Sequence, residues 1–224
     1  MYVTIPTEFA NAKPAPQLLR ATEAPAQKLL KAKSHLFYEG DRVDWLYQIK
    51  SGVVRLTRLL SDGRRQVIAF GYPDDIIGFP SNGYHHTDCE ALTETRLQPY
   101  RRTHLESGKA DPELHTALLQ AALREISAMQ DHFMMLGRKS AAEKLTSFLC
   151  VLSERVGEDL GEYKQFKLPM SRADIADFLG LTTETVSRTF TLLRKSKIIA
   201  IENIHTIVVL RRTALMGLSV GDQA

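Results

Sequence analysis

The sequence predicts an α+β protein in which an antiparallel β domain precedes a long helix and a small helical domain. Apolar residues first alternate at short range, then recur every three or four residues, and finally occur in two short helices followed by a hairpin. We therefore divide the chain into five parts, which are a tail (1–33), the β domain (34–110), the long helix (111–137), the small domain (138–213) and a second tail (214–224).

Composition limits the class of protein. The 224 residues can form one or two domains with a core, and 44% hydrophobic and 25% charged residues are ordinary for a globular chain. No apolar run approaches the roughly eighteen residues of a membrane span, and the N-terminus lacks the basic and then apolar order of a signal peptide. The two cysteines, Cys89 and Cys150, give neither a disulfide framework nor a zinc spacing. We expect a cytoplasmic protein.

The first third of the chain changes character near residue 34. The preceding residues contain four of the nine prolines and no sustained period, which predicts a tail with one short helix near residues 27–31. Beyond it, runs such as Leu46-Tyr47-Gln48-Ile49 alternate with turn pairs such as Ser51-Gly52. Short, evenly spaced strands of this kind indicate an antiparallel sandwich or barrel.

A long helix is predicted from Asp111-Pro112-Glu113, an acidic N-cap followed by a proline at the first helical position. Six apolar residues then follow at the alternating spacing of a coiled-coil seam, namely Leu119, Ala122, Ile126, Met129, Phe133 and Leu136. Such a short stripe could also pack inside its own domain. Because Leu114, Leu118 and Ala121 form a second apolar face, we expect one face to cover the β domain and the other to meet a partner helix.

The small domain begins with a predicted helix at residues 138–156 and a polar loop at 157–165, and its main motif is "MSRADIADFLGLTTETVSRTF". In this stretch Ser171 and Asp174 form a capping-box pattern, and Gly180 ends the first helix. Thr182 or Thr183 caps the second helix. Two helices joined by a short glycine turn are a helix-turn-helix. Their inner faces are Ile175, Ala176 and Leu179 on the first helix and Val186, Phe190 and Leu193 on the second. The β-branched run after them predicts a hairpin wing around Glu202-Asn203.

Glu184, Ser187 and Arg188 share the outer face of the second helix. A carboxylate accepts from cytosine, an arginine donates twice to guanine, and a hydroxyl serves a base or a phosphate, so we expect base contacts here. The alternative is a plain Glu184–Arg188 salt bridge on an exposed helix. Six Lys/Arg against one acid between residues 188 and 213 favour a polyanion partner. Contacts to the DNA backbone are expected from Ser171, Arg172, Thr182, Thr183, Thr185, Arg194, Lys195 and Lys197.

The stretch "DIADFLGLTTETVSRT" resembles the DNA-binding signature of the CRP/FNR superfamily of bacterial transcription regulators. "FYEGDRVDWLYQIKSGVVRL" is similar to the opening strands of the family's cyclic-nucleotide-binding-like β-roll, and "RLLSDGRRQV" is similar to the FixK group. The resemblance implies a winged helix-turn-helix and a homodimer that reads a TTGA-N6-TCAA-like palindrome. It also implies RNA polymerase as a partner, transcription activation, and a low-oxygen or nitrogen-fixation programme.

Departures from the family pattern concern the effector. Nucleotide-sensing members carry a glutamate after the glycine equivalent to Gly78 and an Arg-Ser/Thr pair beyond it, whereas Phe79-Pro80 and His85-His86 stand here. A cyclic phosphate would lose its charge-assisted partners, so we expect no cyclic nucleotide. Residues 1–88 contain no cysteine for an FNR-type iron–sulfur cluster. Met129 occupies the place of an aspartate that weakens FNR dimers, which favours an effector-free dimer.

His85, His86 and Cys89 form the one group that could serve a metal or haem site, and a haem- or metal-dependent gas or redox sensor is the alternative function. If this segment is a strand, adjacent side chains point to opposite faces and both histidines cannot bind one ion. A loop would allow it, but coordination then needs further ligands, for which Glu90 and His104 are the candidates. We expect an exposed loop pair, no metal and no cofactor. A cupin-type enzyme would need a His-x-His pair, and a pure scaffold would leave the Glu-Ser-Arg face unexplained. The sequence therefore predicts a DNA-binding regulator and not an enzyme, with Cys150 as a buried small hydrophobe.

Overall fold

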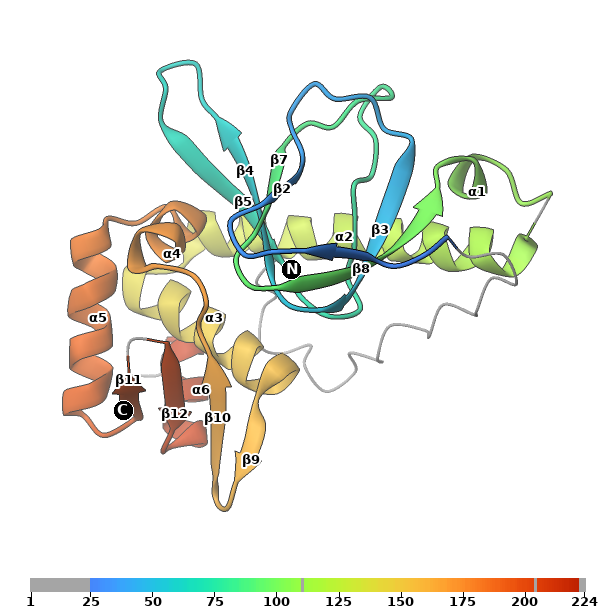
Figure 1. Ribbon diagram of the computed structural model, residues 1–224. Coiled ribbons are helices and arrows are strands. Elements are labelled where there is room, and N and C mark those ends of the chain that lie inside the picture. Colours follow the sequence, from blue (N-terminus) through green and yellow to red (C-terminus); the bar gives the residue numbers. More distant parts are fainter. Residues whose placement is uncertain (1–24, 110, 204, 222–224) are drawn as a thin grey trace. The chain divides into compact units, whose positions relative to one another are not determined.

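The computed structural model describes residues 25–109, 111–203 and 205–221, which form two compact units (Figure 1). Among the described residues, the first unit extends to Ser127 and the second begins at Ala128, so the boundary falls inside one long helix. None of the helices in the described part of the chain has both the length and the apolar character needed to cross a membrane.

The first unit is built from two four-stranded antiparallel sheets. The strand order in one sheet is β1 (Lys28–Leu30), β8 (Thr95–Arg101), β3 (Trp45–Ser51) and β6 (Ile76–Ile77). The order in the other is β2 (His35–Phe37), β7 (Asp88–Ala91), β4 (Val54–Leu59) and β5 (Arg65–Gly71). The predicted antiparallel β domain is confirmed, with alternate residues such as Leu46, Val54 and Leu97 fully buried.

The predicted turn at Ser51-Gly52 is present, and it requires glycine. Gly52 has a φ of +88°, and a Cβ atom there would lie 2.3 Å from the backbone oxygen of Glu94. Only a residue without a side chain fits both conditions, and so Gly52 lets β3 and β4 follow one another closely.

The prediction of a short helix near residues 27–31 is wrong, because this segment contains strand β1. Its three residues pair with β8, with Leu29 opposite Arg96, and burial alternates between exposed Leu29 and buried Leu30. An available sheet edge satisfied the backbone N–H and C=O groups and outweighed a weak local helix preference. The sheet therefore begins six residues before the expected start of the β domain.

Helix α2 (Pro112–Arg138) follows the short helix α1 (Thr103–Glu106), and the Asp111 cap is confirmed by a 2.9 Å bond from the Leu114 N–H to its Oδ1 atom. Leu114 and Leu118 are buried in a cluster with Leu46, Ile76 and Tyr100 of the β-sheets. One apolar face of α2 thus covers the β domain, as the second apolar stripe predicted.

The second unit contains four further helices and a four-stranded antiparallel sheet of order β11-β12-β10-β9. The helices are α3 (Ala141–Val156), α4 (Arg172–Leu179), α5 (Thr183–Lys195) and α6 (Arg212–Val220). The strands are β9 (Glu158–Leu160), β10 (Tyr163–Lys167), β11 (Ile199–Asn203) and β12 (Thr206–Val209). The hairpin wing predicted from the β-branched run is confirmed in β11 and β12.

Three expectations for this unit need correction. Helix α3 begins at Ala141 and not at residue 138, because Ser140 and Glu143 form a capping box. The segment 157–165 is not a loop but the hairpin β9–β10, since β10 pairs with β12 and buries Phe166. Helix α6 occupies residues where a tail was expected from 214, because it packs on α3 with Leu215 and Ser219 buried.

Candidate DNA-binding site

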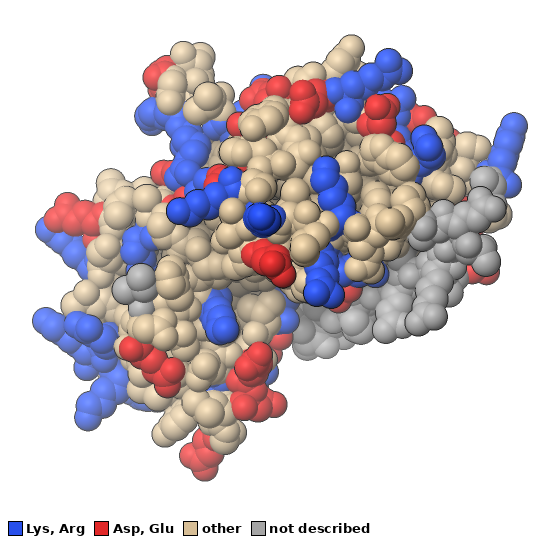
Figure 2. All heavy atoms as spheres, in the orientation of Figure 1, with Lys and Arg blue, Asp and Glu red and all other residues tan. Residues whose placement is uncertain are grey.

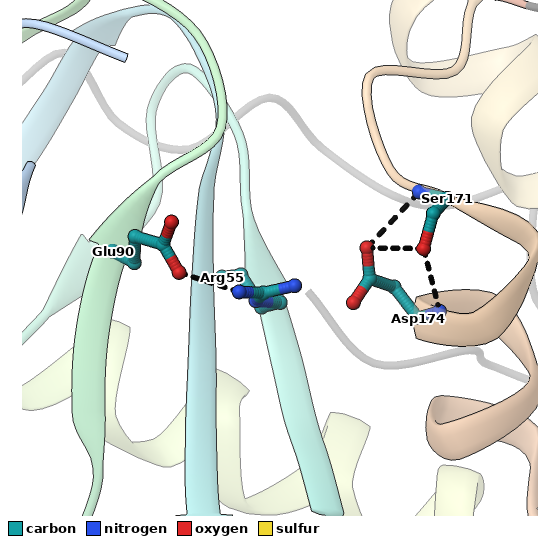
Figure 3. Close-up of polar contacts among 4 residues, drawn as sticks. All are labelled: Arg55, Glu90, Ser171 and Asp174. Atoms are coloured by element: carbon teal, nitrogen blue, oxygen red, sulfur yellow. Dashed lines mark hydrogen bonds and ion pairs between the residues drawn. The ribbon is translucent and has the colours of Figure 1, made fainter. Parts of the chain in front are cut away.

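Helix α4 is fixed at both ends by the residues that the sequence suggested, and Figure 3 shows the pair at its start, Ser171 and Asp174. The Asp174 N–H donates to Ser171 Oγ at 3.1 Å, and the Ser171 N–H donates to Asp174 Oδ2 at 3.0 Å. At the other end Gly180 has a φ of +61°, and its N–H donates to the Ala176 carbonyl. The capping box and the left-handed turn are confirmed, and together they set the point at which the next helix begins.

Helix α5 begins at the Thr182 cap, whose Oγ1 accepts from the Thr185 N–H at 3.1 Å. The predicted inner residues of both helices are all buried, and they are Ile175, Ala176, Leu179, Val186, Phe190 and Leu193. This burial fixes which side of α5 faces outward.

The outward side carries the predicted reading face. The Arg188 and Glu184 side chains form an ion pair at 2.5 Å, and both are largely exposed, at 78% and 70%. Ser187 Oγ donates to the Thr183 carbonyl at 2.8 Å. The salt bridge weighed as an alternative is thus present, but its exposed groups remain accessible to bases, so the two interpretations are compatible.

The residues expected to contact the DNA backbone lie in two groups beside this face. Basic residues gather at the end of α5, where Arg194, Lys195 and Lys197 are exposed, and Figure 2 shows blue side chains there at the left edge of the molecule. Thr182 and Thr183 are exposed at its start. Cationic and hydroxyl side chains are the groups that contact DNA phosphates, so phosphate contacts from both ends of α5 remain a prediction.

Arg172 differs from the other expected backbone contacts. Its guanidinium carbon lies 3.2 Å from the centroid of the Phe190 ring, a cation–π contact between α4 and α5. Burial lowers the pKa of Arg172 to about 10. This side chain therefore has a packing role in the free protein, and a phosphate contact remains a prediction.

The expected seam of α2 is apolar and uncovered in the single chain. Leu119, Ile126, Met129 and Phe133 are exposed, Phe133 by 78%, while Ala122 and Leu136 are partly buried. An apolar stripe of this length on one helix is unusual for a surface in water.

In the β domain, the position after Gly78 has an apolar role. Phe79 packs against the cluster that holds α2, where nucleotide-sensing relatives were expected to present a glutamate. The acid and base on neighbouring strands, Glu90 and Arg55, form an ion pair with each other and are largely buried (Figure 3). Their charges are thereby neutralised within the β-sheet.

The expectation of an exposed histidine pair is wrong for His85 and holds for His86. His85 is buried and its ring stacks on Phe37 at 3.6 Å, so an aromatic partner took it out of solvent. Cys89 is also buried, and burial raises the pKa of its thiol. No group of three or more His, Cys, Asp or Glu that could hold a metal occurs within the described ranges. Cys150 is buried, as predicted.

Comparison with known proteins agrees with this geometry. Residues 143–218 match the family described as Crp-like helix-turn-helix domain, and residues 27–107 match the cyclic nucleotide-binding domain. The chain is 40% identical to the nitrogen fixation regulation protein FixK of Rhizobium meliloti, over 84% of each chain. It is 38% identical to FixK of Azorhizobium caulinodans, over 93% of this chain and 84% of that protein.

The chain belongs to the CRP/FNR family of transcription regulators. The solved structure of FixK2 from Bradyrhizobium japonicum superposes with a TM-score of 0.79 at 34% identity, covering 89% of this chain and 98% of that one. The predicted fold and the FixK resemblance are confirmed, as is the expectation that the protein is not an enzyme. In this CRP/FNR protein, α4 and α5 form the DNA-binding helix-turn-helix.

Sequence reasoning did not single out His132 and Lys139. His132 lies near the C-terminal end of α2 and stacks on Phe178, and Lys139 directly follows α2 and contacts Ser147 and Ser219. No local pattern in the sequence marks them, because their contacts are made with residues far along the chain.

Proposed function

We propose that the protein activates transcription as a homodimer whose two α5 helices read a TTGA-N6-TCAA-like palindrome. The observation that carries the proposal is the exposed Glu184–Ser187–Arg188 face on a capped, glycine-turned second helix. The ion pair holds the carboxylate and the guanidinium side by side, where they can address the cytosine and guanine of one base pair. FixK relatives of this chain are nitrogen fixation regulators by name, and we place this protein in a similar low-oxygen programme.

Ser187 adds a hydrogen-bond acceptor to this face. Because its hydroxyl proton is donated to the Thr183 carbonyl, the oxygen is left to accept a hydrogen bond. In the major groove, adenine N6 and cytosine N4 are the available donors. The hydroxyl therefore favours a half-site with one of these bases at its position.

Dimerisation is proposed through the α2 stripe. Pairing would remove Leu119, Ile126, Met129 and Phe133 from water, and no charged side chain lies among the six seam positions. Two apolar stripes related by a two-fold axis are self-complementary, which a homodimer requires. The alternative, that the stripe packs within its own unit, is not supported by the exposure of these four residues.

Independence from a small-molecule effector is the remaining part of the proposal. Phe79 is committed to the cluster under α2, and Arg55 and Glu90 are committed to each other, so a cyclic phosphate finds neither a ribose-binding acid nor a free cation at these positions. We propose that the dimer binds DNA as synthesised, in the cytoplasm, and contacts RNA polymerase there.

In vitro transcription tests the proposal. The purified full-length chain, under air and without added ligand, should activate RNA polymerase on a promoter bearing the palindrome. The Arg188→Ala variant on the same promoter is the matched control and should activate it much less. Transcription that appears only after a cyclic nucleotide is added, or that is equal on a scrambled site, would overturn it.

A further inference from the structure

The end of α2 belongs to the same compact unit as the helix-turn-helix. The second unit begins at Ala128, and so it includes three residues of the seam, Met129, Phe133 and Leu136. Within this unit the end of α2 is bound at two places by polar side chains.

The first contact is made by His132, which is 7% exposed. Its ring stacks on the Phe178 ring of α4, with centroids 4.4 Å apart and planes within 16°. The backbone of Phe178 also forms a hydrogen bond that favours the protonated ring, so the backbone group is the carbonyl and the ring N–H donates. This carbonyl is one of the last in α4, where no N–H of the same helix is available.

The same residue links α4 to α3. Phe178 is fully buried, and its ring packs against Phe148 of α3 at 5.7 Å and a tilt of 59°. His132, Phe178 and Phe148 therefore form an aromatic row across three helices. Phe178 stands two residues before Gly180, the turn that sets the direction of α5.

The second contact is made by Lys139, the residue after α2. Its Nζ atom donates to Ser147 Oγ of α3 and to the Ser219 carbonyl of α6, each at 2.7 Å. Ser147 and Ser219 are buried, and Ser219 lies in the last turn of α6. A lysine ammonium at the end of a helix satisfies unpaired carbonyls and opposes the negative end of the helix dipole.

Each contact holds the C-terminal end of a helix, α4 through His132 and α6 through Lys139. Hydrogen bonds to buried carbonyls have strict geometry, whereas apolar contacts tolerate sliding. A shift of α2 relative to α4 would leave the carbonyl without a partner in a buried place, which is costly. The two contacts therefore select one orientation of the helix-turn-helix relative to the end of the seam.

We infer that His132 and Lys139 are positioning residues that keep the DNA-reading helices at a fixed orientation to the dimer seam, and so set the half-site spacing that the dimer accepts. This inference rests on the proposed function, because it needs a dimer that reads a palindrome. Neither residue contacts DNA in the proposed complex. They act by holding the helix-turn-helix of each protomer rigidly against the end of α2.

The experiment compares binding of the full-length protein to three duplexes: the palindrome, the palindrome with two inserted base pairs, and random sequence. For the natural protein the insertion should weaken binding at least about 100-fold, to near the random level. In His132→Phe, which keeps an aromatic ring but loses the donor, binding to the palindrome should fall about 10-fold and the insertion penalty should shrink to below about 10-fold. Lys139→Met should do the same, and His132→Gln, which keeps a donor, should recover part of the penalty.

The matched control is His115→Phe. His115 lies on the same helix and its Nδ1 atom makes the same kind of contact, 3.0 Å from the His104 carbonyl, but in the first unit. It should leave the insertion penalty unchanged. A residue that only stabilised the fold would lower binding to all three duplexes by one factor, so unchanged ratios in His132→Phe and Lys139→Met would overturn the inference. If the natural protein itself shows no penalty, the proposed palindrome-reading dimer fails instead.

Discussion

At the scale of single residues, α5 separates side chains that form the core of the domain from side chains that are exposed to solvent. Val186 and Phe190 are buried, whereas Glu184 and Arg188 are held by an ion pair in solvent. Such an exposed pair contributes only about 0.3–0.5 kcal/mol to helix stability. Substituting either member should therefore change binding far more than folding.

Arg188→Ala should cost about 1–3 kcal/mol of specific binding and blur discrimination at one guanine in each half-site. Titration of duplexes substituted at each base pair measures this. Lys195→Ala, on the basic end of the same helix, is the control, because it should weaken all sequences and reduce the salt slope by about one unit. Equal losses on specific and random DNA for Arg188→Ala would make it a phosphate contact.

His132 should make stability depend on pH. Burial, with a contribution from nearby Lys144, lowers its pKa from 6.5 to about 4 in the folded chain. Between these values the unfolded chain binds more protons, so its contribution is complete above pH 6.5 and is lost as the pH falls toward 4, by up to about 3 kcal/mol.

Urea unfolding at several pH values checks this expectation, with His132→Phe as the comparison. The variant should be less stable at pH 7 but should lose less stability between pH 6.5 and 4. Parallel pH profiles for the two proteins would show that the ring is not held neutral in the folded state.

At the scale of elements, local signals and tertiary contacts explain different parts of the second unit. The capping box at Ser171 and the turn at Gly180 were predictable because their chemistry is contained in a few neighbouring residues. The hairpin β9–β10 was not, since its strand character depends on pairing with β12 about forty residues later. The same holds for β1, whose partner is β8, and for the stacking that buries His85.

Two glycine substitutions separate backbone strain from steric conflict. Gly180→Ala should cost about 1–2 kcal/mol, because φ is +61° but a Cβ atom meets nothing within 4 Å. Gly52→Ala should cost clearly more, since its Cβ atom would collide with the Glu94 backbone as well. Denaturant unfolding of both variants measures the difference, and equal costs would show that the turn at Gly52 relaxes freely.

Helix α2 should lose its partner when a charge enters the seam. Ile126→Glu would place two carboxylates beside a two-fold axis in an apolar interface, which neither tolerates. Sedimentation should give a folded monomer. Gln120→Glu adds the same charge to the same helix at an exposed position outside the seam and should remain dimeric. A dimeric Ile126→Glu protein would mean that the stripe is not the interface.

At the scale of the whole molecule, the order of the domains could be predicted from the sequence, whereas the contacts between α2 and the second unit's other helices could not. The order of β domain, long helix and helix-turn-helix, and the residues of the reading face, followed from periodicity, caps and family resemblance. The contacts of His132 and Lys139 did not, because they join residues about 46 and 80 positions apart through burial and hydrogen-bond geometry. An effector-free regulator would need these contacts to be rigid.

The central claim is that an unliganded dimer reads two half-sites in a fixed relation, about one helical turn or 34 Å apart. Inserting two base pairs rotates the half-sites by about 70° and separates them by a further 7 Å or so. The most direct measurement is the affinity of the purified protein, under air, for the palindrome and for the lengthened site, each with and without cyclic AMP. We expect tight binding to the palindrome alone and no response to cyclic AMP at either spacing. Tight binding to the lengthened site, or a clear cyclic AMP response on the palindrome, would contradict the claim.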